Sequence, residues 1–104
     1  MTRTRRVLAA VLTVACAPHA GAADAPALAK SNQCTVCHAT ESRQVGPSFK
    51  EIAAKYKDDA KAGDTLAASI KGGSSGKWGA LPMPPNAAVG DADAHALAAW
   101  ILSL

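Results

Sequence analysis

The sequence predicts an all-α fold of about four short helices, and three observations lead to this prediction. Apolar residues recur at helical spacing in several segments of the chain. Glycine and proline stand between these segments, where helices commonly begin or end. No segment alternates apolar and polar residues as a half-buried strand would.

The first 22 residues have the three parts of a secretory signal peptide. A basic start (residues 1–6) precedes an apolar run (residues 7–17), and Ala20-Gly21-Ala22 forms a small-residue cleavage site. The apolar run is too short to span a bilayer, which takes about 20 apolar residues. We therefore expect cleavage after Ala22, a periplasmic mature domain comprising residues 23–104, and no membrane anchor in it.

Cleavage changes the charge of the chain. Removing Arg3, Arg5 and Arg6 leaves eight of the eleven basic residues against eight acidic ones, so the mature chain has no formal net charge. Its 82 residues are enough for one domain. No basic patch interleaved with aromatic residues indicates binding to nucleic acid.

The first mature helix is expected over residues 25–33, with Asp24 as its N-cap. It leads into Cys34-Thr35-Val36-Cys37-His38, the C-x-x-C-H pattern of covalent haem attachment. Two thiols three residues apart share one side of a helical turn, so both can reach the two vinyl groups along one porphyrin edge. We expect thioether bonds from Cys34 and Cys37 to one haem c, with His38 as the proximal iron ligand.

The cysteine pair has two other interpretations. A thioredoxin-like dithiol needs a strand and helix around it, and a zinc site needs a second ligand pair. The remaining cysteine, Cys16, falls in the predicted leader, where Thr13 replaces the aliphatic residue of a lipoprotein signal. Arg5-Arg6 would also suit twin-arginine export, but haem is normally added after translocation, which favours general secretion of an unfolded chain.

The next two helices are marked by apolar spacing. The first of these is expected to begin at Pro47, and it places Phe49, Ile52 and Tyr56 on one face. After a polar connection, residues 64–71 form a short helix that Asp64 caps and Gly72-Gly73 ends.

The last helix is expected over residues 91–104. Leu97, Trp100, Ile101 and Leu104 lie at i, i+3, i+4 and i+7, and Asp91 serves as the N-cap. Residues 72–79, which precede it in the chain, are rich in glycine and serine and indicate a loop around Trp78.

The mature chain is poor in large apolar residues. Alanine dominates, and only four aromatic residues remain. Domains of this size usually need a staple or a bound group to complete the core. We therefore expect haem to be part of the core and the protein without haem to be largely unfolded.

A second axial ligand has to come from Met83 or His95, because the mature chain has no other methionine or histidine besides His38. Pro82, Pro84 and Pro85 stiffen the loop that carries Met83, so its sulfur can be presented at little entropic cost. His95 lies nearly opposite the Leu97 face of the last helix and is expected to face solvent. Met83 is therefore the predicted ligand.

Together these motifs resemble the short class I cytochromes c of bacterial respiratory chains, the cytochrome c-551 type. The resemblance covers about residues 24–104 and rests on the haem motif, Val45-Gly46-Pro47, Trp78-Gly79 and Pro82-Met83-Pro84-Pro85-Asn86. It implies a class I fold wrapped around one haem.

The resemblance also implies supporting roles. The Pro47 carbonyl would accept a hydrogen bond from the His38 ring, Trp78 would donate to a haem propionate, and Asn86 would hydrogen-bond near the Met83 sulfur. Some relatives carry an arginine that meets a propionate where this chain has Ser69. Lys71 or water would then compensate that charge.

The predicted function is that of a soluble, monomeric one-electron carrier and not of an enzyme. The resemblance suggests quinol–cytochrome c reductase as the donor and nitrite reductase or a terminal oxidase as the acceptor. Docking at the haem edge is expected to be transient, steered by lysines (Lys30, Lys50, Lys71 and Lys77). The alternatives are a haem enzyme or gas sensor with a labile sixth ligand, and a haem-free thiol or metal module.

Overall fold

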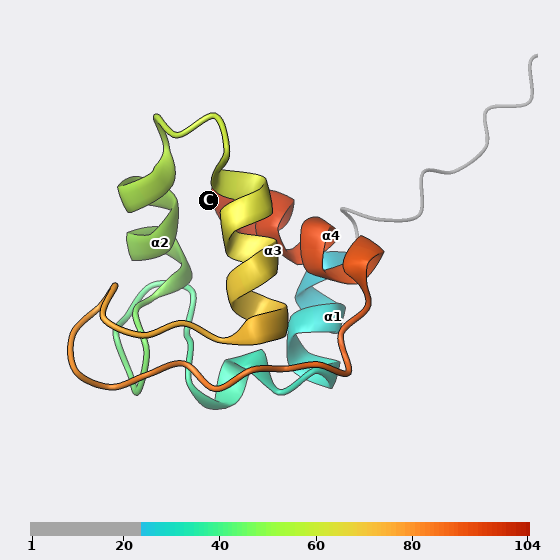
Figure 1. The fold of residues 1–104 in the computed structure, drawn as a ribbon, viewed down its shortest axis with the longest axis horizontal. Helices are drawn as coiled ribbons and strands as arrows, with labels where there is room; N and C mark the ends of the chain where they lie inside the picture. Colours follow the sequence, from blue (N-terminus) through green and yellow to red (C-terminus); the bar gives the residue numbers. More distant parts are fainter. Residues whose placement is uncertain (1–23) are drawn as a thin grey trace, which may run out of the picture.

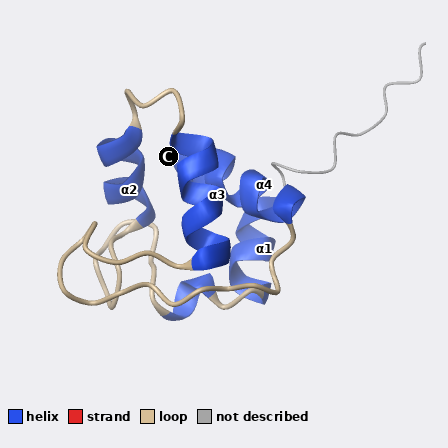
Figure 2. Cartoon of the chain, in the orientation of Figure 1, coloured by secondary structure: helices blue, strands red, loops and turns tan. Residues whose placement is uncertain are grey.

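The computed structural model describes residues 24–104, so the predicted signal peptide and its cleavage site lie outside the described residues. This part of the chain forms four α-helices and one 3-10 turn (Figures 1 and 2). They are α1 (Ala25–Ser31), η2 (Cys34–Val36), α2 (Phe49–Tyr56), α3 (Ala62–Gly72) and α4 (Asp91–Leu102). Residues 24–104 contain no strand, and the all-α prediction is confirmed. Within the same residues, no helix is both long and apolar enough to cross a membrane.

The C-terminal helix α4 holds the domain together, because it packs against α1, α2 and α3. Its buried face consists of Ala94, Leu97, Ala98 and Ile101, which recur at helical spacing. The helix ends at Leu102, two residues earlier than predicted, and Leu104 is consequently exposed.

The core is divided into two apolar clusters. The buried residues of the first cluster are Ala29, Ala67, Ile70, Val89, Ala94 and Leu97. The buried residues of the second cluster are Phe49, Ile52, Leu66, Ala98 and Ile101. Cys34 and Trp100 pack against both clusters. The haem motif therefore lies where the two halves of the core meet.

Helix α2 begins with a capping box that the sequence analysis did not predict. Ser48 Oγ accepts a hydrogen bond from the Glu51 backbone N–H (3.1 Å), and Glu51 Oε2 accepts one from the Ser48 N–H (2.7 Å). Pro47 precedes the N-cap, so its predicted place as the first helical residue is wrong. Its carbonyl is left outside the helix and free to accept a hydrogen bond from elsewhere.

Of the other predicted N-caps, one matches the structure in position and two do not. Asp24 is the N-cap of α1, although its side chain makes no capping hydrogen bond. Asp64 lies within the first turn of α3, which starts at Ala62, and Asp91 is the first residue of α4. Carboxylates there still interact favourably with the positive end of the helix. The N-caps of α3 and α4 are Lys61 and Gly90, so these two predictions were wrong by three residues and by one, and right in which helix end was acidic.

Candidate functional site

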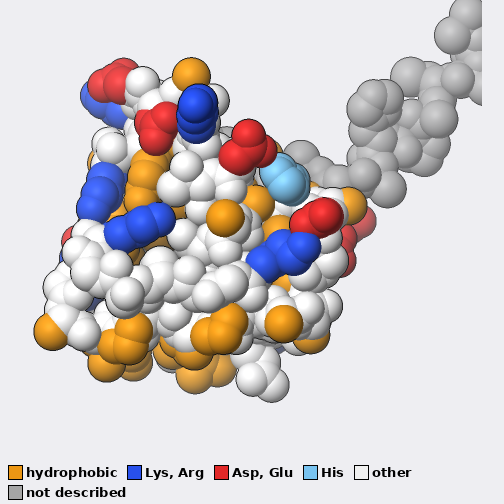
Figure 3. All heavy atoms as spheres, viewed as in Figure 1, with side chains coloured by type: hydrophobic (Ala, Val, Ile, Leu, Met, Phe, Trp, Pro, Cys, Tyr) orange, Lys and Arg blue, Asp and Glu red, His pale blue; other side chains and the backbone are white. Residues whose placement is uncertain are grey.

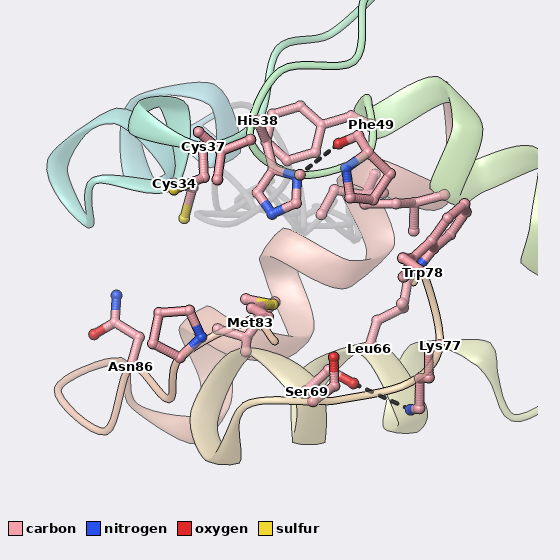
Figure 4. A pocket seen from close by; sticks show the side chains of 18 of the residues that line it. Cys34, Cys37, His38, Phe49, Leu66, Ser69, Lys77, Trp78, Met83 and Asn86 are labelled. Carbon is pink, nitrogen blue, oxygen red and sulfur yellow. Dashed lines mark hydrogen bonds between the residues drawn. The ribbon is translucent and has the colours of Figure 1, made fainter. Parts of the chain in front are cut away.

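A cavity of about 490 Å³ lies between the haem motif on one side and α3 with the loop around Met83 on the other (Figure 4). This volume falls within the roughly 300–1,000 Å³ of typical ligand pockets. All four α-helices contribute apolar lining, through Ala29, Ile52, Ile70 and Leu97. The structure brings every predicted site residue to this cavity: Cys34, Cys37, His38, Pro47, Trp78, Met83 and Asn86.

The two cysteines occupy one wall because the chain turns tightly after α1. Gln33 has φ 61°, in the left-handed region, and directs the chain into η2. The Cys37 and His38 N–H groups both donate to the Cys34 carbonyl, at 3.2 and 2.9 Å, which closes a single helical turn. Both thiols are unpaired and half-buried, and burial raises the pKa of the Cys34 thiol. The pair is thus held as neighbouring, accessible sulfurs on one turn.

His38 is fixed by contacts on both sides of its ring. Its Nδ1 donates to the Pro47 carbonyl at 2.6 Å, which is the hydrogen bond that the resemblance implies. Phe49 stacks on the ring, with centroids 5.4 Å apart and planes inclined by 24°. Because Nδ1 carries the proton, Nε2 is left as a lone-pair donor, and Figure 4 shows it pointing into the cavity.

Met83 faces His38 from the opposite wall (Figure 4). Its backbone forms an antiparallel bridge with Ser74: Met83 N–H donates to Ser74 O at 2.8 Å, and Ser74 N–H donates to Met83 O at 3.1 Å. Gly73, at φ 77°, makes this approach possible, since a Cβ there would lie 2.7 Å from the Met83 carbonyl oxygen. The proline loop is therefore held to the end of α3 as well as being stiff.

Asn86 makes a different hydrogen bond from the one predicted. Its Nδ2 donates to the Asn32 carbonyl at 3.0 Å, and its backbone N–H donates to Ile70 O at 2.9 Å. Among residues 24–104 the structure shows no hydrogen bond from this amide to Met83. Asn86 instead links the Met83 loop to the end of α1, across the cavity edge.

Trp78, Ser69 and Lys77 lie together at one end of the cavity (Figure 4). Lys77 Nζ donates to Ser69 Oγ at 3.4 Å. Lys71, one of the two groups expected to compensate the propionate charge, forms an ion pair with Asp91. Lys77 is thus the lysine that contacts Ser69. Its position in a glycine-rich loop did not predict this contact.

His95 does not line the cavity and is exposed. Its ring lies between the Asp91 carbonyl and the Asp64 carboxylate, on the α3–α4 surface. Within residues 24–104 no three His, Cys, Asp or Glu side chains form a group that could hold a metal ion.

An all-α domain whose helices surround an apolar cavity, with the C-x-x-C-H motif on its wall, has the architecture of a c-type haem protein. The family model described as Cytochrome c matches residues 22–104. The chain belongs to the cytochrome c family, as a short class I member.

Two relatives illustrate this membership. The chain is 60% identical to cytochrome c-552 of Nitrosomonas europaea over 86 residues, covering 82% of this chain and 84% of the relative. It is 58% identical to cytochrome c-551 of Azotobacter vinelandii over 76 residues, covering 73% and 92%. The crystal structure of wild-type Nitrosomonas europaea cytochrome c552 superposes with a TM-score of 0.75 at 59% identity, covering 76% of this chain and 98% of that one.

Family membership confirms the class I all-α fold and the cofactor. The protein carries one covalently attached haem c with its iron, and it functions in electron transfer. The cavity fits this group, because it places two thiols, an imidazole nitrogen and a thioether around one apolar space.

Proposed function

We propose that the protein is a periplasmic one-electron carrier between respiratory complexes, with His38 and Met83 as the two axial ligands of its haem iron. One observation supports this above the others: His38 Nε2 and the Met83 side chain face each other across the apolar cavity (Figure 4). Cys34 and Cys37, on the His38 side, would form the thioether bonds.

The residues around the ligands keep them in place. The Pro47 carbonyl and the Phe49 ring orient His38, while the Ser74 bridge holds Met83. When bound, the haem supplies an iron that changes by one unit of charge. Rigid ligands keep the accompanying reorganisation small, and His/Met ligation favours the reduced form. With both axial positions taken by protein side chains, no position is left for a substrate, which is why we propose a carrier and not an enzyme.

Partner docking is proposed at the exposed rim of the cavity. Val36, Val45 and Leu81 line the cavity and are 68%, 59% and 66% exposed. Figure 3 shows hydrophobic side chains along the lower edge of the molecule, over the loops that Figure 1 draws there. Such a rim suits a small transient interface, below about 1,200 Å², between a monomeric carrier and its redox partner.

Steering of the partner by lysines contributes less to docking than apolar contact does. Of the four predicted lysines, Lys50 pairs with Glu41 at 2.7 Å and Lys71 pairs with Asp91. These pairs neutralise much of the charge that would attract an acidic partner. Apolar contact is therefore the main proposed source of docking energy.

Export of the chain by a signal peptide comprising residues 1–22 completes the proposal. It rests on the basic start, the apolar run and the Ala20-Gly21-Ala22 site.

Spectroscopy on Met83→Ala, with His95→Ala as the matched control, tests the ligation. The near-infrared band of methionine-bound ferric haem should be present in the wild type and in His95→Ala, and absent in Met83→Ala. Only Met83→Ala should bind carbon monoxide readily in the ferrous state, because only there is a coordination position open.

A wild-type protein that lacks the band and binds carbon monoxide would instead have an open sixth site, as in a haem enzyme or gas sensor. A haem stain on a denaturing gel, performed on the same samples, reports whether the haem is covalently attached.

A further inference from the structure

Two cations lie over the Trp78 ring at one end of the cavity, and a third belongs to the neighbouring Lys77. Lys55 Nζ lies 4.4 Å from the centroid of the Trp78 ring, and the Arg43 guanidinium lies 5.9 Å from it. Lys77 adjoins Trp78 in sequence, and its Nζ reaches Ser69 Oγ. Arg43, Ser69, Lys77 and Trp78 all line the cavity. Positive charge is thus concentrated at one end of an otherwise apolar space.

Two of these cations have no acidic partner in the described part of the chain. Arg43 is paired with Glu51 at 3.1 Å, but neither Lys55 nor Lys77 forms a salt bridge within residues 24–104. The only side-chain hydrogen bond of Lys77 goes to a neutral hydroxyl at 3.4 Å. An ammonium at the edge of an apolar cavity gains most from an anion that arrives with the ligand.

The cofactor supplies such an anion, since haem carries two propionate carboxylates. We propose that Lys77, beside Ser69, is the charge partner of a haem propionate in this protein. Its Nζ lies 3.4 Å from Ser69 Oγ, and Ser69 stands where the resemblance implies a propionate-binding arginine in some relatives. Lys71 does not line the cavity and pairs with Asp91 instead.

Lys55 acts as a positioning residue for this partner. Its Nζ donates to the Lys77 carbonyl at 2.7 Å while lying over the Trp78 ring. These two contacts tie the backbone at residues 77–78 to α2. The Lys77 ammonium and the Trp78 indole are therefore presented from a fixed segment of the loop.

A cation at this place has a measurable electrostatic effect. Reduction removes one positive charge from the haem, so a nearby ammonium favours the reduced state and raises the reduction potential. The same ammonium stabilises the ionised propionate and lowers its pKa. Removing the ammonium should lower the potential and raise the pH at which the propionate titrates.

The test is voltammetry of the holoprotein as a function of pH, with Lys77→Gln, Lys77→Arg and the control Lys57→Gln. Lys57 is exposed, lies outside the cavity and carries the same charge. For Lys77→Gln we expect a lower potential at pH 7 and an upward shift, by about one pH unit, of the propionate titration. Lys77→Arg should behave like the wild type, and Lys57→Gln should leave the titration unchanged.

This inference rests on the proposed His38/Met83 ligation, and the experiment separates the two. The near-infrared band of the wild type reports on the ligation alone. If that band is present and Lys77→Gln titrates like the wild type or like Lys57→Gln, the role of Lys77 is overturned while the proposed function stands. If the band is absent from the wild type, the proposed ligation itself has failed.

Discussion

Gly46 lies against the His38 ring and leaves no room for a side chain. A Cβ at this position would lie 2.6 Å from His38 Cε1 and 3.0 Å from Nδ1, closer than real Cβ atoms approach. The ring cannot easily move away, because Phe49 stacks on it and the Pro47 carbonyl accepts a hydrogen bond from its Nδ1–H. Gly46 therefore helps to set the direction of the nitrogen that faces the cavity.

Gly46→Ala should displace the His38 ring and destabilise the protein by about 1–3 kcal/mol, the usual cost of overpacking. Gly63→Ala is the control: it lies in α3, where an added Cβ meets nothing within 4 Å. That change should stabilise the protein by about 0.4–1 kcal/mol, because alanine has less conformational freedom in the unfolded chain. Denaturant unfolding of the two holoproteins measures both effects, and equal stabilities would contradict the packing argument.

At the residue scale, the sequence was informative wherever the signal was local. The spacing of Cys34, Cys37 and His38, and the prolines around Met83, are patterns of neighbouring residues. The contact of Gly46 with His38 was not predicted, because it depends on how the chain folds back after the motif. Gly46 could be read from the sequence only as a turn residue.

At the element scale, α2 carries the Ser48–Glu51 capping box directly beside the His38 support. Ser48 is buried, with 1% of its surface exposed, and Phe49 is the first residue of the helix. The Ser48 N–H is the main reason that the pKa of Glu51 is lowered, with Arg43 adding to it. The helix start that positions Phe49 is thus held by hydrogen bonds rather than by apolar packing alone.

Ser48→Ala should destabilise the holoprotein by about 1 kcal/mol, because it leaves the partly buried Glu51 N–H without its acceptor. Ser42→Ala, at an exposed position outside any helix, is the control and should change stability little. The urea midpoint of unfolding measures the difference. A Ser48→Ala midpoint equal to that of the control would show that the cap contributes nothing.

His95 connects α3 to α4 in a pH-dependent manner. Nδ1 faces the Asp91 carbonyl at 2.8 Å and Nε2 faces the Asp64 carboxylate at 3.1 Å. Both partners are acceptors, so only the protonated ring can donate to both. The Asp91 carbonyl first, and the Asp64 carboxylate second, therefore raise the pKa of His95 in the folded protein.

A raised pKa in the folded state means that the folded protein binds the proton more tightly than the unfolded chain. The stability from this link is fully present below the unfolded pKa of about 6.5 and is lost as the pH rises through the higher folded value. We expect the wild-type urea midpoint to fall over this window. Asp64→Asn, which keeps the histidine but removes its carboxylate, should show a smaller fall, and an unchanged fall would assign the pH dependence to other groups.

The elements themselves were predicted better than their ends. Apolar spacing located α2, α3 and α4, because that spacing reflects a face that becomes buried, whereas α1 was predicted from Asp24 and an alanine-rich segment. The start of α3 and the N-cap of α4 differ from the predictions, since Asp64 and Asp91 suit a first turn as well as an N-cap. The bridge between Ser74 and Met83 joins two residues nine positions apart within the segment that connects α3 to α4, and it has no sequence signal.

At the scale of the whole molecule, the core is arranged around the cavity rather than filling it. Leu66 and Ile70 lie on the same helix and both line the cavity, but they belong to different apolar clusters. The cavity is therefore lined by residues of both clusters. Many of the buried apolar residues are alanines, and each alanine buries little area. Composition alone predicted this shortage of core residues, and the cofactor explains it.

The protein without haem should therefore be largely unfolded. Without haem, the apolar side chains that line the cavity of about 490 Å³ would face water instead of an apolar partner. A domain of this size is stable by only about 4–12 kcal/mol, so the loss of this burial is a large change for it.

A variant with Cys34→Ser and Cys37→Ser, purified free of haem, tests this expectation. Circular dichroism should show much less helix than in the wild-type holoprotein and no cooperative thermal transition. Cys16→Ser, which changes the cysteine in the predicted leader, should yield a haem-bearing, helical protein like the wild type. If the haem-free double variant keeps the helix content of the holoprotein and unfolds cooperatively, the alanine-rich helices must pack without the cofactor, and haem would be a guest in a preformed cavity instead of a part of the core.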